Sequence, residues 1–281
     1  MGNKTTLESL GIQSVLDLPS VGQNFSDQPV TTNSWFVNSN DTLELWTQNA
    51  TQFAEVFAQW NNTRTGPLVD AIATHIVWMR LDSDSPIFDK FSDPSAGPQT
   101  PHIELGLNPG IGLVDPVPTG HFFSSATAVV SPVSRGSITL NTSNPFDAPL
   151  IDPALFVSDF DIFAMRTAVL KTQTFLSAPA WKDYIIRPVD NLARALVSDA
   201  ALDEYIRNTS ISAQHPVGSA AMTAKSATWG VVNPDLRVKG TTGLRIVDAS
   251  VMPFVPSGHT QAPTYAVAER GSDLIKNSWT Y

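Results

Sequence analysis

The run GLRIVDASVMPFVPSGHTQAPTYAVAERGSDLIK, residues 243–276, decides how the whole sequence is interpreted. Its apolar residues 244–248 predict a short strand, and the Pro- and Gly-marked segment after them predicts a loop. A helix is expected over 260–276, with Pro263 in its first turn, where a missing N–H costs nothing. A strand, a loop and a helix in this order are typical of a helix N-terminus that faces an anionic or electron-rich group, although the spacing alone fits an ordinary capped C-terminal helix equally well.

The chain that precedes this run is predicted to alternate regular elements with loops. Residues 10–19 predict an extended stretch that ends in a turn. From Phe53, apolar residues recur at i, i+3, i+4 and i+7 within 46–60, which predicts a helix packed on a core. Residues 71–81 predict a strand, and the Pro-rich residues 82–120 predict an irregular loop.

The central part adds two strands and two helices. Residues 121–130 and 136–140 read as strands, and their short connection predicts an antiparallel pair. Ser158 and Ser198 are each followed by an acidic residue, as at a helix N-terminus. These signals predict helices that run to about residue 176 and residue 207.

Composition limits the function. The chain has 281 residues, 42% hydrophobic and 15% charged, which is typical of a folded globular protein. Its formal charge of -9 disfavours nucleic acid and anionic membrane surfaces as partners. No apolar run approaches the ~20 residues that span a bilayer. The absence of cysteine excludes disulfides and thiolate metal ligands.

N-glycosylation sequons bear on the compartment. Seven of the 15 asparagines lie in Asn-X-Ser/Thr sequons. They are Asn3, Asn24, Asn40, Asn49, Asn61, Asn141 and Asn208. This number favours a secreted, extracellular glycoprotein, with a signal peptide outside the chain as given.

Two of the five histidines have unusual surroundings. His215 and His259 each lie on a tight loop with Gly and Pro nearby. A neutral imidazole near pH 7 can take a proton from an alcohol or donate a hydrogen bond to its oxygen. The two groups are therefore candidates to converge on one substrate oxygen, although either alone is more often structural.

The other chemistry-bearing patterns are weaker. His75 is expected to be a hydrogen-bonded core residue, and His102 and His121 are expected at the surface. No pair of histidines has metal-ligand spacing, so no metal site is expected. No Gly-X-Ser-X-Gly elbow is present to support a serine nucleophile.

Several motifs together resemble the C-terminal half of the glucose-methanol-choline (GMC) oxidoreductases, most of all the fungal aryl-alcohol oxidases. The matching pieces are residues 18–27 (LPSVGQNFSD), 63–68 (TRTGPL), 131–136 (SPVSRG), 215–218 (HPVG), 229–236 (WGVVNPDL), 243–250 (GLRIVDAS) and 259–261 (HTQ). Each motif is weak alone, and their order and spacing carry the resemblance.

The resemblance implies an activity and a set of site residues. It implies FAD-dependent oxidation of a primary, aromatic alcohol to the aldehyde, with O2 as acceptor. His215 would be the base that takes the alcohol proton, and His259 would hydrogen-bond the same oxygen. The residues implied to lie against FAD are Asp248, Ala249, Thr260, Gln261 and Asn24, with Asp27 approaching from the other side.

The resemblance also implies a fold. We expect an α+β fold: a mostly antiparallel sheet with helices on one face, plus C-terminal pieces of a Rossmann-like FAD-binding domain. Residues 1–30 would be a remnant of the FAD domain or a linker. Residues 31–210 would bind substrate, and residues 211–281 would hold the active-site loops and the C-terminal part of the FAD domain.

Two departures qualify what the resemblance implies. Gln214 stands where aryl-alcohol oxidases have an aromatic residue before the base, which leaves the aromatic preference open. The chain also has no G-X-G-X-X-G turn of the kind that holds a dinucleotide pyrophosphate. It therefore reads as a chain without the N-terminal part of the FAD domain, with weak or no FAD binding and little activity alone.

The same departures leave two alternatives open. One is a non-redox module that keeps the substrate pocket for binding or interaction. The other is a cofactor-free acid–base enzyme that uses His215 and His259. An apolar face shaped to pack on an FAD domain would favour association with other molecules.

Overall fold

The computed structural model describes residues 1–70, 73–112 and 118–279, which divide into two compact units. We call Met1–Pro29, Val130–Asp161 and Ser212–Tyr281 the site unit. We call Val30–Val129 and Ile162–Ile211 the sheet unit. The chain therefore crosses between the units near residues 29, 130, 161 and 211. The division into residues 1–30, 31–210 and 211–281, with a separate function for each, stays a prediction.

An antiparallel sheet organises the sheet unit. Its strands are β1 (Pro29–Val37), β2 (His75–Met79), β3 (Ile103–Asn108), β4 (Phe122–Val129) and β7 (Ile185–Pro188). They follow the order β2-β3-β4-β1-β7, and each neighbouring pair is antiparallel. In this register Trp35 lies opposite Phe123, a cross-strand aromatic pair that stabilises the pairing.

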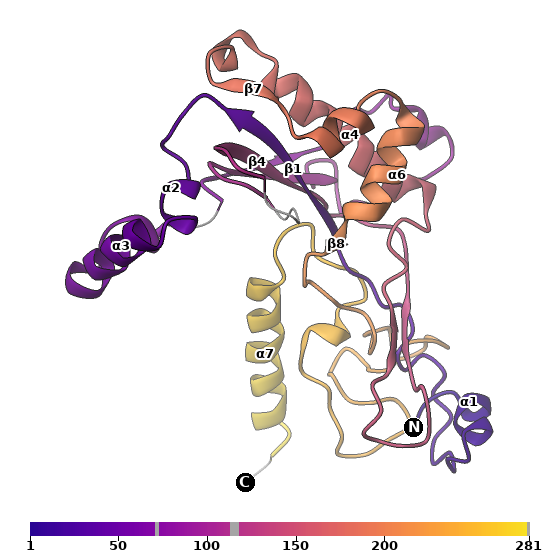
Figure 1. The fold of residues 1–281 in the computed structure, drawn as a ribbon. Helices are drawn as coiled ribbons and strands as arrows, with labels where there is room; N and C mark the ends of the chain where they lie inside the picture. Colours follow the sequence, from indigo (N-terminus) through magenta and orange to yellow (C-terminus); the bar gives the residue numbers. More distant parts are fainter. Residues whose placement is uncertain (71–72, 113–117, 280–281) are drawn as a thin grey trace. The chain divides into compact units, whose positions relative to one another are not determined.

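Helices α4 (Asp159–Leu176), α5 (Asp190–Ala195) and α6 (Asp199–Thr209) lie over one face of this sheet, whereas α2 (Glu44–Thr47) and α3 (Ala50–Thr63) project away from it (Figure 1). The 3-10 turns of this unit are η1 (Pro67–Val69), η2 (Pro86–Asp89) and η3 (Pro179–Trp181). The core includes Trp35, which is 1% exposed and donates from Nε1 to Gln173 of α4. The predicted α+β class, mostly antiparallel with helices on one face, is confirmed.

The helix predicted within 46–60 forms, but its packing differs from the prediction. It is divided into α2 and α3, and no residue of α3 is buried. Phe53, Phe57 and Trp60 stack on one another with ring centroids 5.8 to 6.3 Å apart. Phe57 remains 48% exposed. The aromatic side chains of α3 therefore contact one another and do not pack on a core.

Two predictions about strands are wrong. The expected loop over 82–120 contains β3, which is buried at every position and pairs with β2 and β4. The residues 121–130 and 136–140 do not pair with each other, because β4 joins the large sheet while β5 (Ser137–Thr139) pairs with β6 (Leu150–Asp152). Residues 71–72 and 113–117, which fall within the predicted elements, lie outside the described residues.

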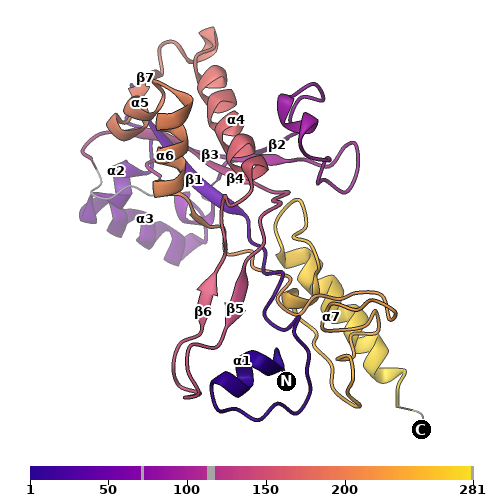
Figure 2. The same ribbon diagram turned by 90° about the vertical axis from the view of Figure 1, so that its right-hand side faces the viewer.

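Loops dominate the site unit. Its regular elements are α1 (Lys4–Ser9), the antiparallel strands β5 and β6, the 3-10 turn η4 (Ala249–Val251) and α7 (Gln261–Lys276). Figure 2 shows β5 and β6 side by side. Val232, Leu236 and Val251 form its main apolar cluster, against which Val267 of α7 packs. The predicted C-terminal helix is therefore confirmed.

Two extended stretches predicted in this unit are wrong. Residues 10–19 contain one bridge, from Asp17 to Gly2, and residues 244–248 contain one, from Arg245 to Arg237. An apolar run without a continuous partner forms no strand. Among the described residues, no helix is long and apolar enough to cross a membrane.

Candidate active site

His215 and His259 meet in the site unit. Their ring centroids are 5.2 Å apart with the ring planes inclined by 38°. His215 follows the two-residue strand β8 (Ile211–Ser212), and His259 precedes α7 by two residues. Forty-four residues of chain separate the two imidazoles. The structure thus brings together the two side chains singled out as candidates from the sequence.

Asp27 holds the turn that carries His215. Its side chain is 4% exposed, and its Oδ1 accepts from the backbone N–H of His215 at 3.1 Å. Its Oδ2 accepts from the hydroxyl of Ser212, which in turn accepts from the N–H of Gln214 at 2.8 Å. The carboxylate of Asp27 thus binds the backbone around the proposed base, and its implied place beside a cofactor stays a prediction.

Gln28 contacts both histidine loops and was not among the candidates predicted from the sequence. This side chain is 1% exposed, and its Oε1 lies 2.7 Å from Nδ1 of His215. Its Nε2 lies 2.9 Å from the carbonyl oxygen of Pro256, 3.1 Å from that of Gly258 and 3.2 Å from that of Val130. Its position directly after the quoted motif at residues 18–27 was the available signal.

A close backbone contact fixes the position of the His215 turn. Gly218 has φ +87°, and a Cβ there would lie 2.3 Å from the carbonyl oxygen of Asn24. Asn24 itself has φ +60° and donates from Nδ2 to the carbonyl of Pro253 at 3.0 Å. Asn24 is thereby tied to the loop before His259. Only a residue without a side chain fits at position 218.

The remaining residues implied to lie against a cofactor occupy two element starts. Asp248 caps η4, accepting from the N–H of Ser250 at 2.8 Å, and Ala249 is the first residue of that turn. Thr260 is the N-cap of α7, and Gln261 is its first residue. No side-chain hydrogen bond caps this end of α7, so no side chain satisfies the N–H groups that give the helix N-terminus its partial positive charge.

Two of the other histidines do not match their predicted settings, and His121 is partly exposed with its Nδ1 2.8 Å from the hydroxyl of Thr42. His75 is exposed on β2, whereas His102 is fully buried. The ring of His102 accepts at Nδ1 from the N–H of Leu81 and faces Asp93 at 2.9 Å through Nε2. Burial raises the pKa of Asp93, but hydrogen bonds from His102, Ser95 and Arg80 outweigh it and hold that pKa well below its ordinary value. His102 is therefore a buried, hydrogen-bonded residue and not the surface residue that was predicted.

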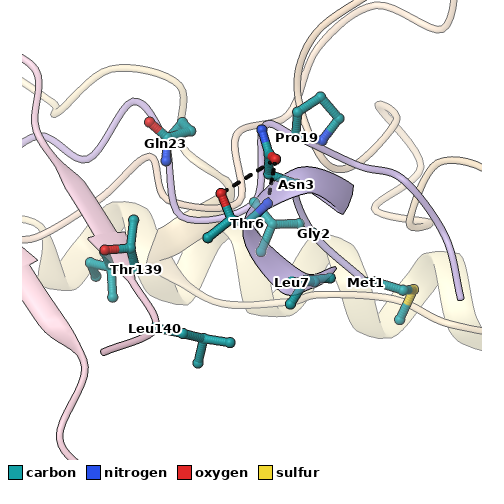
Figure 3. A pocket seen from close by; sticks show the side chains of 11 residues that line it. Met1, Gly2, Asn3, Thr6, Leu7, Pro19, Gln23, Thr139 and Leu140 are labelled. Carbon is teal, nitrogen blue, oxygen red and sulfur yellow. Dashed lines mark hydrogen bonds between the residues drawn. The ribbon is translucent and has the colours of Figure 1, made fainter. Parts of the chain in front are cut away.

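Among the described residues, the histidine pair belongs neither to a group of metal-ligating side chains nor to the cavity beside α1. Within the described ranges, no three His, Asp or Glu side chains are grouped so as to hold a metal ion. A cavity of about 470 Å³ lies between α1 and β5, where Asn3, Thr6 and Thr139 line it (Figure 3). None of its lining residues belongs to the network around His215 and His259.

Comparison with known proteins assigns a family. Residues 132–268 match the family model for GMC oxidoreductases. The dehydrogenase eriK of Hericium erinaceus is 40% identical over 289 residues, and pyranose dehydrogenase 2 of Leucoagaricus meleagris is 38% identical over 292. Each match covers 99% of this chain and 47% of the relative, so the chain spans about half the length of these curated relatives.

Solved structures agree with the sequence matches. A formate oxidase from Aspergillus oryzae RIB40 superposes with a TM-score of 0.89 at 28% identity, over 99% of this chain and 51% of its own. A fungal aryl-alcohol oxidase superposes with a TM-score of 0.78 at 26% identity, over 99% of this chain and 52% of its own. The chain therefore belongs to the GMC oxidoreductase family, and its resemblance to the C-terminal half of that family is confirmed.

Proposed function

We propose that this chain supplies the substrate-binding and acid–base half of an FAD-dependent enzyme that oxidises an alcohol to a carbonyl compound. The observation that supports this most is the approach of His215 to His259, at 5.2 Å between ring centroids, with the backbone of both loops held by buried polar side chains. Two relatives of this chain are named dehydrogenases, and two structural neighbours are oxidases.

The two imidazoles divide the work on the alcohol oxygen. His215 takes the hydroxyl proton through Nε2, the ring nitrogen that does not contact Gln28. His259 donates a hydrogen bond to the same oxygen and so stabilises the negative charge that develops there. A bound flavin supplies the acceptor for the hydride that leaves the carbinol carbon. The loss of one proton and one hydride balances the conversion of the alcohol to the aldehyde.

The residues present fit a flavin. The exposed N-terminus of α7 carries no side-chain cap and favours an electron-rich ring edge, which Thr260 and Gln261 would contact. Asp248 and Ala249 would lie along the ribityl and phosphate region, with Asn24 close by. Because the chain has no G-X-G-X-X-G turn, we infer that tight binding needs a dinucleotide-binding element in addition.

The substrate is a primary alcohol with an aromatic or polar body. The resemblance to aryl-alcohol oxidases supports an aromatic alcohol, whereas the exposed Gln214 before the base supports a polar one. The 38% identity with a pyranose dehydrogenase supports a sugar. O2 is the proposed acceptor of the electrons.

We also propose that the protein acts outside the cell and associates through the face that carries α7. The seven sequons support secretion. Tyr265 of α7 is 66% exposed, and Ala262 and Ala266 on the same helix are exposed as well. An apolar helix face of this kind favours contact with another folded element.

Replacement of the base tests the proposed activity. In the flavin-loaded protein, His215→Ala should lower the rate of alcohol-dependent flavin reduction about 10³-fold, as expected for loss of a general base. The measurement is anaerobic bleaching of the flavin absorbance by aromatic alcohols and by sugars. His75→Ala, which changes an exposed histidine of the sheet unit, should leave the rate unchanged.

Equal rates in both variants would refute the proposed function. Calorimetry on flavin-free protein then separates the alternatives. Tight binding of alcohols without flavin would indicate a non-redox binding module. Flavin-independent turnover of an ester or carbonyl compound that is lost in His215→Ala would indicate an acid–base enzyme.

A further inference from the structure

The buried amide of Gln28 has only one orientation that satisfies its neighbours. One end of the amide faces three carbonyl oxygens, those of Val130, Pro256 and Gly258, at 2.9 to 3.2 Å. Carbonyl oxygens only accept hydrogen bonds, so the group facing them must be the NH2 of the amide. The other end, which faces His215, must then be the oxygen Oε1.

This orientation decides the proton position on His215. Oε1 of an amide can only accept, and it lies 2.7 Å from Nδ1 of His215. Nδ1 must therefore carry the ring proton of the neutral imidazole. The lone pair is then on Nε2, which is the form a general base needs on that nitrogen. The reverse tautomer would place two acceptors against each other at Nδ1.

Because Gln28 is buried, water cannot readily take over the hydrogen bonds of its amide. Gln28 is 1% exposed, and its backbone oxygen accepts from the N–H of Ala213, two residues before His215. Its backbone N–H is held by Asp27 at 2.7 Å, the same carboxylate that holds the N–H of His215. Asp27 therefore fixes the backbone of His215, and Gln28 fixes its ring.

The same amide reaches the second histidine. Gly258, whose carbonyl accepts from Nε2 of Gln28, directly precedes His259, and Pro256 lies two residues before that. A rotation of the Gln28 amide would break its bonds to the His259 loop and its bond to His215 together. One side chain therefore couples the tautomer of one histidine to the loop position of the other.

From these contacts we propose that Gln28 is a positioning residue that locks His215 in the Nδ1–H tautomer and ties the loop of His259 to it. The inference rests on the proposed function only for its catalytic consequence. The tautomer itself is a property of this chain and is measured without substrate or flavin.

The first test is the 15N spectrum of the full 281-residue chain labelled at histidine. In the unmodified chain, the long-range 1H–15N pattern of His215 should be that of the Nδ1–H tautomer. In Gln28→Met, which keeps the length of the side chain and removes both hydrogen-bonding ends, His215 should shift to the Nε2–H tautomer that free histidine prefers. Gln99→Leu, an exposed glutamine of the sheet unit, is the control and should leave the pattern unchanged.

The second test uses the flavin-loaded protein. Gln28→Met should lower kcat for alcohol oxidation about 10²-fold or more with KM changed less, because a base held in the wrong tautomer loses up to ~10⁴ in a serine protease. Gln28→Asn, which keeps the amide one methylene short, should recover less than a tenth of the lost activity.

The outcomes separate this inference from the proposed function. A proton on Nε2 of His215 in the unmodified chain would overturn the inference, as would an unchanged tautomer in Gln28→Met. If the tautomer follows the expectation but His215→Ala retains full alcohol oxidation, the inference stands and the proposed function fails.

Discussion

The two units of this protein hold their chains in place by different means. In the sheet unit, ladder hydrogen bonds and a buried apolar core around Trp35 and Phe122 fix the strands. In the site unit, regular elements are short, and the loops are fixed by buried side chains such as Asp27, Gln28 and Asp161 that bond to backbone groups. Substitutions of core residues in the sheet unit should therefore lower stability through lost packing. Substitutions of buried polar residues in the site unit should displace loops.

The largest expected effect is on packing in the sheet unit. Trp35→Ala removes a side chain that is 1% exposed and should lower the free energy of unfolding by about 3 to 5 kcal/mol. Urea unfolding followed by circular dichroism measures it. Trp279→Ala, at a position 69% exposed, should change it by less than about 0.5 kcal/mol. Trp279 belongs to the site unit, so similar losses in both variants would show that burial of the tryptophan side chain does not set the size of the loss.

A smaller effect is expected from crowding the His215 turn. Gly218→Ala places a Cβ against the carbonyl of Asn24 at a φ of +87° and should cost about 2 kcal/mol of unfolding free energy. Thermal unfolding provides the measurement. The matched variant Gly258→Ala adds a Cβ with no atom within 4 Å and should leave stability nearly unchanged. Equal effects at both positions would contradict the close contact.

Asp161 tests how buried carboxylates hold loops in the site unit. It accepts from the N–H groups of Val133 and Ser134 at 2.8 Å each, so Asp161→Asn should cost about 1 to 2 kcal/mol. Burial raises the pKa of Asp161 above 3.8 despite hydrogen bonds from Ser134 and Val133. The stability linked to that raised pKa is complete below pH 3.8 and is lost as the pH rises through the folded-state pKa.

The difference in unfolding free energy between the unmodified chain and Asp161→Asn should therefore shrink as the pH rises. Urea unfolding at a series of pH values measures this difference. Growth of the difference with pH would mean that the two N–H donors hold the ionised carboxylate better than water does.

The smallest effect on stability concerns glycosylation. Asn141 is exposed, whereas the amide of Asn24 is half-buried and donates to Pro253. In protein secreted from a fungal host, mass spectrometry of glycopeptides should find a glycan on Asn141 and none on Asn24. Asn141→Gln should remove one glycan and change the unfolding free energy by less than about 0.5 kcal/mol. A glycan on Asn24 would contradict the loop contact that the structure shows.

Local signals in the sequence predicted the longer helices, the family resemblance and the two candidate histidines, whereas α1 and α5 were not predicted. Ser198 accepts from the N–H of Ala201 at 3.2 Å and starts α6 as predicted, and Pro263 lies in the first turn of α7. Such signals act over a few residues, so they can be seen in the sequence. The motif at residues 18–27 ended one residue before Gln28, whose contacts lie 102 to 230 residues away in the chain.

The pairing of the strands, the burial of polar residues and the contacts that hold His215 could not be predicted from local sequence, because they depend on tertiary contacts. β3 was not predicted, because it lies in a Pro-rich segment and is stabilised by hydrogen bonds to its neighbours β2 and β4. His102 is buried because Leu81 and Asp93 satisfy both ring nitrogens. These outcomes depend on contacts between residues that are far apart in the chain. Such contacts stabilise a strand or a buried side chain but leave no signal in the sequence next to it.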